Sequence, residues 1–288
     1  MKHGISASFK DKLITNLFRA IYHTLPIGSL CERLAAPLIV RNREWRDYRF
    51  QRPLNVVHLT DLHFDPKAGI GLNSIQEVVN RTKALNTDLI LITGDFIVDQ
   101  CWHIEAYSQK LRQLVAICPV YATLGNHDGG TWAGTNGGFK DTVIIKHILA
   151  EAKIELLYNE HRTIKIKNNT IQLVGLSDLW AGDFHPETAF KGSDPTIPTI
   201  LLSHNPDTLP HLKAFTWDIM LAGHTHGGQV VLPFIGAPWT PIEDKNLTAG
   251  AIMVDGRRML YVSTGTGGVF QLRYNCPAEI INLQLSPR

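Results

Sequence analysis

The fold is decided by two runs of sequence, LNVVHLTDLH at residues 54–63 and DLILITGD at residues 88–95. Each run is mostly apolar and rich in β-branched residues over the length of one strand, which is typical of a strand buried on both faces. Each run then changes to polar residues where the strand ends. Residues 74–85, between the two runs, have the apolar spacing of a helix. A strand, a helix and a second strand in this order predict two parallel strands joined by a helical crossover.

The same alternation continues to about residue 155. Helices are predicted over residues 104–117 and 141–152, with a strand between them over residues 120–124. The rest of the chain changes to short strands joined by turns. These strands are predicted over residues 162–167, 170–176, 199–203, 218–222, 251–254 and 258–263. Two sheets stacked face to face with helices outside would bury both halves, so we predict an α/β fold of that arrangement.

Five of the predicted strand ends carry side chains that bind metals. Open α/β sheets place their ligands at the carboxyl ends of the strands, which is where these side chains fall. In extended chain, residues two apart point to one face, so the first carboxylate and imidazole should converge. The side chains, in chain order, are Asp61 and His63, then Asp95, then Asn126, His127 and Asp128, then His204, and last His224 and His226.

The donor set is mixed, with carboxylate and amide oxygens beside imidazole nitrogens. Such a set suits Mn²⁺, Fe, Zn²⁺ or Co²⁺, and is poor for Ca²⁺ or for a metal that selects thiolates. Seven donors are too many for one tetrahedral site, but they suffice for two sites if one carboxylate bridges them. Two metals about 3.5–4 Å apart can share a hydroxide and clamp both oxygens of an in-line phosphoryl displacement. Each segment alone could be a turn or a helix cap, but five together favour a metal centre.

The order D-x-H, G-D, G-N-H-D, H and G-H-x-H resembles the calcineurin-like metallophosphoesterase superfamily, over about residues 54–286. Residues 60–63, 203–207 and 223–229 are similar to its bacterial branch of small, often membrane-associated phosphoesterases. This resemblance implies a four-layer fold in which two mixed β-sheets form a sandwich flanked by helices. It also implies a hydrolase that acts on phosphoester or pyrophosphate bonds with a hydroxide activated by two metals.

The resemblance also assigns roles to the individual side chains. His127 would contact the phosphate or protonate the leaving oxygen, and Asp128 would orient the His127 ring. Two divalent transition-metal ions are expected, with Mn²⁺ favoured over Fe, Zn and Co. The ligands of one ion would be Asp61, His63, Asp95 and His226, and those of the other would be Asp95 as the bridge, Asn126, His204 and His224.

The first 52 residues differ in charge from the rest of the chain. They hold ten Lys and Arg against four Asp and Glu, whereas the remainder holds eighteen against twenty-two. Residues 8–23 have the spacing of an amphipathic helix, and five arginines follow from Arg41 to Arg52. Pro53 is the predicted boundary between a basic helical segment, residues 1–52, and a dinuclear phosphoesterase domain, residues 53–288.

We expect this segment to bind an anionic membrane surface through residues 8–23 and the arginines from Arg41 to Arg52. The alternative is that its helix packs on the protein's own core. No stretch reaches about 18 uninterrupted apolar residues, so the expectation is peripheral attachment at the cytoplasmic face of the inner membrane. The four cysteines form no CxxC pair, which favours a reducing compartment. A monomer is expected.

A membrane-bound phosphoesterase is expected to act on an amphiphilic phosphate. Some relatives in the bacterial branch act as UDP-2,3-diacylglucosamine pyrophosphatases of lipid A synthesis, so the resemblance implies cleavage of that compound to 2,3-diacylglucosamine 1-phosphate and UMP. A glycine-rich segment, residues 129–139, could admit an acyl chain as a flap beside the site, or could be a disordered loop. Residues 263–268 are interpreted as a turn close to the metals, and His58 as a hydrogen-bonded core histidine.

Two other classes of function remain open at this point. A soluble phosphodiesterase of nucleotides or nucleic acid would use the basic segment to bind phosphates. That function is disfavoured because residues 8–23 interleave Leu and Ile instead of aromatic residues that stack on bases. A non-enzymatic binding module is disfavoured because the set of metal-binding side chains is intact.

Overall fold

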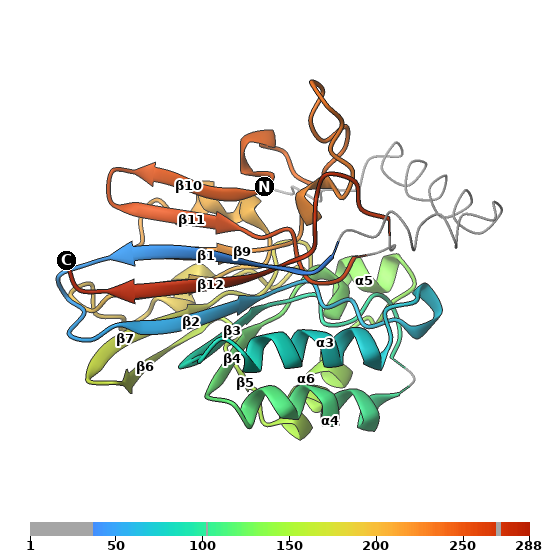
Figure 1. Cartoon of the computed structure of the whole chain (residues 1–288), viewed down its shortest axis with the longest axis horizontal. Helices are drawn as coiled ribbons and strands as arrows, with labels where there is room; N and C mark the ends of the chain where they lie inside the picture. Colours follow the sequence, from blue (N-terminus) through green and yellow to red (C-terminus); the bar gives the residue numbers. More distant parts are fainter. Residues whose placement is uncertain (1–36, 102, 269–271) are drawn as a thin grey trace.

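A computed structural model describes residues 37–101, 103–268 and 272–288 (Figure 1). Two six-stranded sheets lie face to face in it. The first sheet has the order β1 (Ile39–Arg46), β12 (Glu279–Ser286), β2 (Leu54–Leu59), β3 (Leu89–Thr93), β4 (Val120–Thr123) and β5 (Glu155–Leu156). The second has the order β10 (Gly250–Asp255), β11 (Arg258–Val262), β9 (Ile219–Ala222), β8 (Thr199–Leu202), β7 (Asn169–Gly175) and β6 (Glu160–Ile166). Both sheets are mixed, because β12–β2, β10–β11 and β6–β7 are antiparallel and the other pairs are parallel.

Three longer helices cover the outer face of the first sheet, as Figure 1 shows: α3 (Leu72–Lys83), α4 (Ile104–Val115) and α6 (Val143–Ala152). In α3 the buried residues Ile75, Val78, Val79 and Thr82 recur at the spacing of one helix face. The outer face of the second sheet is covered by shorter elements, and its core includes Phe190, Leu212, Trp217 and Leu247. These elements are α7 (Pro186–Ala189), η3 (Pro206–Leu212) and η5 (Lys245–Leu247).

A third apolar core fills the space between the two sheets. It combines residues of the first sheet, such as Leu91 and Leu283, with residues of the second, such as Leu173 and Leu221. The protein therefore has four layers, and the predicted α/β fold of two stacked mixed sheets is confirmed. The predicted elements agree closely with the observed ones, since the helix expected over residues 74–85 is Leu72–Lys83.

The N-terminal prediction needs a correction where the structure describes it. The basic segment was predicted to be helical up to residue 52, but Ile39–Arg46 is the edge strand β1, which pairs in parallel with β12 over its whole length. Phe50, in the following turn, is buried in the core between the sheets. The boundary predicted at Pro53 therefore lies inside the fold. The amphipathic helix predicted over residues 8–23 lies outside the described residues.

The arginines of this region also have partners within the protein. The Arg49 guanidinium contacts Asp218 Oδ1 at 2.5 Å and Asp47 Oδ2 at 2.7 Å, and Arg41 contacts Glu279 at 2.6 Å. Much of the positive charge that the sequence shows here is therefore balanced locally. Among the described residues, no helix has the length and apolar character needed to cross a bilayer.

Candidate metal centre

The predicted metal-binding side chains come together at one edge of the sandwich, where the carboxyl ends of β2, β3 and β4 meet those of β8 and β9. Parallel pairing brings these strand ends side by side within each sheet. All seven predicted ligands are at least nine-tenths buried: Asp61, His63, Asp95, Asn126, His204, His224 and His226.

The first group of donors consists of Asp61, His63 and His226. Asp61 Oδ1 lies 3.8 Å from His63 Nε2 and 3.7 Å from His226 Nε2. The two imidazole nitrogens are 3.1 Å apart. The three side chains thus converge on one small volume, although Asp61 and His63 come from the first sheet and His226 from the second.

The second group consists of Asp95, His204 and His224. Asp95 Oδ2 lies 3.1 Å from His204 Nε2, and it also lies 3.4 Å from His63 Nε2 of the first group. Asp95 is therefore the carboxylate that contacts imidazoles of both groups. The His204 ring is held from behind, because its Nδ1 bonds to the backbone oxygen of Thr93 at 2.7 Å. This contact leaves Nε2 directed at Asp95.

The backbone brings these side chains together in a way that the extended-strand argument did not predict. Asp61 and His63 converge, but their φ angles are +54° and +45°, in the left-handed region rather than the extended one. Asp95, His224 and His226 also have positive φ, of +53°, +70° and +51°. Such conformations are strained for residues other than glycine, and they cluster at functional sites. The side chains of Asp61 and His63 converge as predicted, but through left-handed and not extended backbone.

Asp61 is enclosed by two close-packed turns. A Cβ at Gly223 would collide with the Asp61 carboxylate, and a Cβ at Gly265 would meet the Asp61 side chain from another direction. The turn over residues 263–268 is fastened here by hydrogen bonds, since Gly267 N donates to Asp61 O at 2.7 Å and Thr266 N to Thr60 O at 3.0 Å. The interpretation of this turn as a segment close to the metal-binding side chains is confirmed.

His127 lies beside both groups in η2 (Asn126–Asp128). Its backbone N–H donates to Asp95 Oδ1 at 3.0 Å, and its ring belongs to a cluster with His63 and Asp95. The ring Nδ1 bonds to the backbone oxygen of Val98. The Val98 oxygen therefore orients the ring through Nδ1, whereas the resemblance implied that Asp128 would orient it.

Asp128 has a different structural task. Its Oδ1 accepts from Phe96 N at 2.7 Å, and its Oδ2 accepts from Gly125 N at 2.9 Å. The buried carboxylate thus joins the turn after β3 to the turn after β4, and so fixes Asp95 relative to His127.

Comparison with known proteins gives the chain a family. The sequence pattern of the calcineurin-like phosphoesterases matches residues 54–228, the stretch that contains all seven predicted ligands and also His127 and Asp128. The chain belongs to the calcineurin-like phosphoesterase family. It is 35% identical to phosphodiesterase YaeI of Escherichia coli over 81% of this chain and 82% of that protein. It is 29% identical to the UDP-2,3-diacylglucosamine pyrophosphatase LpxG of Chlamydia trachomatis over 79% of this chain and 82% of that protein.

Family membership makes the protein a hydrolase and implies divalent metal ions. The buried groups of this phosphoesterase fit such ions. Burial lowers the pKa of His63 and His224 to about 3, so both rings are neutral at neutral pH, which is the form that binds a metal. For His204, burial lowers the pKa but the nearby Asp95 carboxylate outweighs it and raises the pKa to about 10. The negative charge of Asp95, which stabilises a proton on His204, would also stabilise a metal cation bound between the two side chains.

One further atom fits a metal ion better than it fits an ordinary core. The Oδ1 atom of Asn126 is fully buried and receives no hydrogen bond from any described residue. A buried amide oxygen without a donor is costly unless a cation or a water molecule contacts it. Asn126 adjoins His127, whose backbone bonds to Asp95. The donor chemistry and this uncompensated oxygen both fit a divalent ion at the second group.

Two tryptophans that were not predicted from the sequence adjoin the metal centre. The Trp132 ring lies 4.6 Å from the His127 ring, centroid to centroid, and the Trp180 ring lies 4.5 Å from the His224 ring. The two indoles are 6.0 Å apart. Trp132 belongs to α5 (Thr131–Thr135) in the glycine-rich segment, which therefore lies beside the site, as its interpretation as a flap requires. A large aromatic residue, Trp132, within this glycine-rich segment was the sequence signal that could have identified it.

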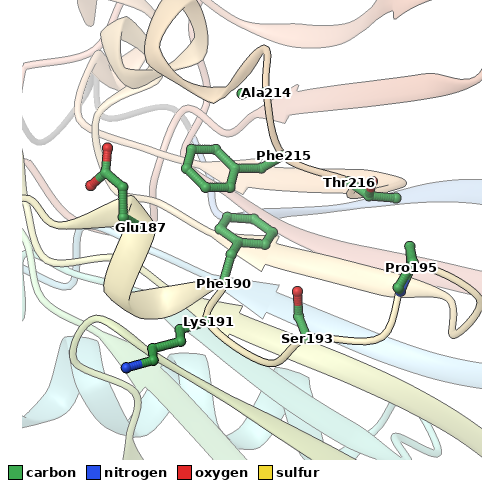
Figure 2. Close-up of a pocket in the computed structure, with 8 residues that line it drawn as sticks. All are labelled: Glu187, Phe190, Lys191, Ser193, Pro195, Ala214, Phe215 and Thr216. Carbon is green, nitrogen blue, oxygen red and sulfur yellow. The ribbon is translucent and has the colours of Figure 1, made fainter.

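A hollow of about 360 Å³ lies elsewhere on the phosphoesterase (Figure 2). Figure 2 shows Phe190 and Phe215 at its centre, where their rings stack at 4.7 Å, with Glu187 and Lys191 at its edge. None of the predicted metal ligands is among its lining residues. The hollow is therefore separate from the metal centre.

Proposed function

We propose that this chain is a dinuclear phosphohydrolase that cleaves an amphiphilic phosphodiester or pyrophosphate. The observation that carries the proposal is the position of Asp95, whose Oδ2 contacts both His63 and His204. A carboxylate shared between two imidazole groups has the geometry of a bridging ligand. Asp61, His63, Asp95 and His226 would hold one ion, and Asp95, Asn126, His204 and His224 the other, with Mn²⁺ favoured.

Ions bound there would polarise the phosphoryl oxygens and make water a better nucleophile at neutral pH. The protein's own contribution at the leaving group comes from His127. Its Nδ1 is engaged by Val98 O, so the other ring nitrogen is free to carry a proton towards the substrate. Asp128 keeps His127 at the correct distance from Asp95 through its bonds to Phe96 and Gly125.

The specific substrate that we propose is UDP-2,3-diacylglucosamine, cleaved to 2,3-diacylglucosamine 1-phosphate and UMP as a step of lipid A synthesis. Support comes from the relative named as the pyrophosphatase of that compound, which aligns with most of this chain. A second candidate is a phosphodiesterase that acts on nucleotides or nucleic acid, which the relative named YaeI keeps open at the level of bond type.

The decisive experiment offers the purified, metal-loaded chain both classes of substrate. UDP-2,3-diacylglucosamine in mixed micelles should yield equal amounts of UMP and the lipid phosphate by mass spectrometry, and a chelator should abolish the reaction. Cyclic nucleotides and single-stranded DNA should be cleaved far more slowly. Faster cleavage of the nucleotide substrates would replace the lipid proposal by the second candidate while leaving the hydrolase assignment intact.

We further propose peripheral attachment to the cytoplasmic face of the inner membrane through residues 8–23. Replacing Leu13 and Leu17 with Glu should move the protein to the soluble fraction, because apolar contact with the interface is replaced by charge that anionic lipid repels. Turnover of the lipid substrate should fall while a small soluble phosphodiester is spared. Equal slowing on both substrates would mean that this helix packs on the catalytic domain.

A further inference from the structure

One exposed apolar segment is not accounted for by the core or by the metal centre. Residues 230–239, VVLPFIGAPW, form what we term the apolar loop, and none of its ten side chains is charged. Phe234 is fully exposed, at 109% of its reference area, and Ile235 is 72% exposed. The loop projects from the top of the body in Figure 1, drawn in orange. Large apolar side chains gathered on a projecting loop are typical of an interaction site.

The exposure of these side chains does not come from a loose backbone. Leu232 N donates to Gly236 O at 2.8 Å and Gly236 N donates to Leu232 O at 2.9 Å, which closes the turn. At the base of the loop, Val231 N donates to Tyr274 O at 2.9 Å. Phe234 has φ of +66°, a conformation that is strained for a bulky residue. The fold thus holds Phe234 outward at some cost, and no packing within the described protein compensates for it.

Both ends of the apolar loop adjoin the metal centre. A single residue, Gln229, separates the loop from η4 (His226–Gly228), which carries a predicted metal ligand. On its return it passes Gly228, where an added Cβ would meet Ala237. The next turn brings the Pro241 oxygen to 3.3 Å from His224 Nε2. A surface that contacts the tip is therefore connected to the metal centre by a short and well-bonded path.

We propose that the apolar loop inserts Phe234 and Ile235 into the interfacial region of a phospholipid bilayer and so presents the metal centre to phosphates embedded there. The occupant is a lipid surface and not a second protein, because a projecting tip offers far less than the roughly 800 Å² per partner that a stable protein interface buries. A fluid bilayer, in contrast, closes around an uncharged apolar tip. Tyr274, at the base and 41% exposed, lies where a headgroup layer would meet the loop. The inference rests on the proposed function only in taking the substrate to be amphiphilic.

The test measures vesicle binding by the full-length chain carrying F234D and I235D. On vesicles of phosphatidylethanolamine and phosphatidylglycerol, the partition coefficient should fall about tenfold or more, because two apolar side chains that would enter the bilayer are replaced by charged ones. The fall should persist at high salt, since the contact is not ionic. It should appear also on the background of L13E and L17E, so that residues 8–23 do not mask it. V143D, which alters another exposed apolar side chain, should bind as the unaltered chain does.

Hydrolysis of a soluble aryl phosphodiester and the metal content should be unchanged in the F234D and I235D chain. Unaltered vesicle binding would overturn the proposal. If the altered chain also changed from dimer to monomer, the tip would be a contact between two copies of the chain and not a membrane contact. Binding is measured without turnover, so inactivity on lipid substrates would contradict the proposed function and leave the loop proposal standing.

Discussion

The two sheets make unequal contributions to the metal centre. Among the predicted ligands, the turns after the first sheet's strands supply both carboxylates, the amide and the imidazole of His63, whereas the second sheet supplies imidazoles alone, from His204, His224 and His226. Among the described residues, two groups of donors within 4.8 Å take side chains from both sheets, namely Asp61, His63 and His226, and Asp95, His204 and His224. The group of His63, Asp95 and His127 comes from the first sheet alone. Neither sheet holds a complete pair of sites. The metal centre exists only where the sandwich is closed.

The difference extends to the outer faces. The first sheet is covered by α3, α4 and α6, whose apolar stripes make a continuous core with it. The second sheet is covered by short helices and turns, and its strand ends lead into longer excursions, including the apolar loop. Regular packing behind the first sheet suits a region that positions charge, and irregular cover on the second leaves segments available to contact other surfaces.

The largest expected effect comes from Asp95, the residue of the first sheet that contacts imidazoles from both. Asp95→Asn should remove both metals together and abolish activity, because the amide loses the charge that a bridging ligand supplies. Elemental analysis after gel filtration checks this prediction. Asp88→Asn is a matched change at an aspartate just before the opposite end of β3, where the carboxylate accepts from Asn55 N, and it should retain both metals. One metal retained at full occupancy in Asp95→Asn would show that Asp95 does not bridge.

Substitution of single histidines should distinguish the two metal sites. His226→Ala should empty the site that includes Asp61 and His63, and His204→Ala should empty the site that includes Asp95 and His224. Each variant should retain about one metal per chain and lose most activity. His161→Ala, a half-buried histidine whose ring contacts the Ala189 oxygen, is the control and should retain two metals. Loss of both metals from either variant would mean that the two groups form one interdependent site.

Substitution of His127 tests whether turnover can be lowered at the first sheet while both metals stay bound. His127→Ala should retain both metals and lower turnover by about 10²–10⁴-fold, the usual contribution of a general acid. The defect should shrink for an activated aryl leaving group, which needs little protonation. His185→Ala, at an exposed ring, should have normal turnover. An equal defect on good and poor leaving groups would indicate that His127 positions the phosphate instead.

The smallest expected effect concerns a contact that joins the two sheets at the other end of the strands. Arg49 follows β1 and contacts both Asp47 and Asp218, the residue before β9. Arg49→Met should lower the free energy of unfolding by about 1–3 kcal/mol, because charged hydrogen bonds are lost and two half-shielded carboxylates are left without a cation. Urea unfolding measures the change. Arg46→Met, at an exposed pair with Glu44, should alter stability little.

This contact should also show a dependence on pH. The hydrogen bonds from the Arg49 side chain hold the pKa of Asp47 below its usual value, although burial opposes them. A carboxyl whose pKa is depressed on folding stabilises the protein above its unfolded pKa, about 3.9, and that contribution is lost as the pH falls through the folded pKa. The stability difference between the unaltered chain and Arg49→Met should therefore be steady near neutral pH and shrink below about pH 4. A difference that grew on acidification would contradict this origin.

The strands and helices of the two sheets could be predicted because their signals are local. Apolar runs such as residues 88–93 and the apolar spacing of residues 74–85 encode element type over a few residues. The elements that were not predicted depend on distant partners. The strand β1 contains alternating arginines that read as a basic surface, and it becomes a strand by pairing with β12, some 240 positions away, where Arg41 meets Glu279. No local pattern carries that information.

The same division holds for the metal centre. The sequence by itself determined which side chains can bind metal and that they follow strand ends, because ligand chemistry belongs to the residue and strand order to the local pattern. Only the tertiary structure decided how they converge: left-handed backbone at Asp61, His63 and Asp95, the Val98 oxygen on the His127 ring, and Trp132 and Trp180 beside the site. These features depend on close packing of turns from both sheets, and the free energy of that packing resides in contacts between residues far apart in the chain.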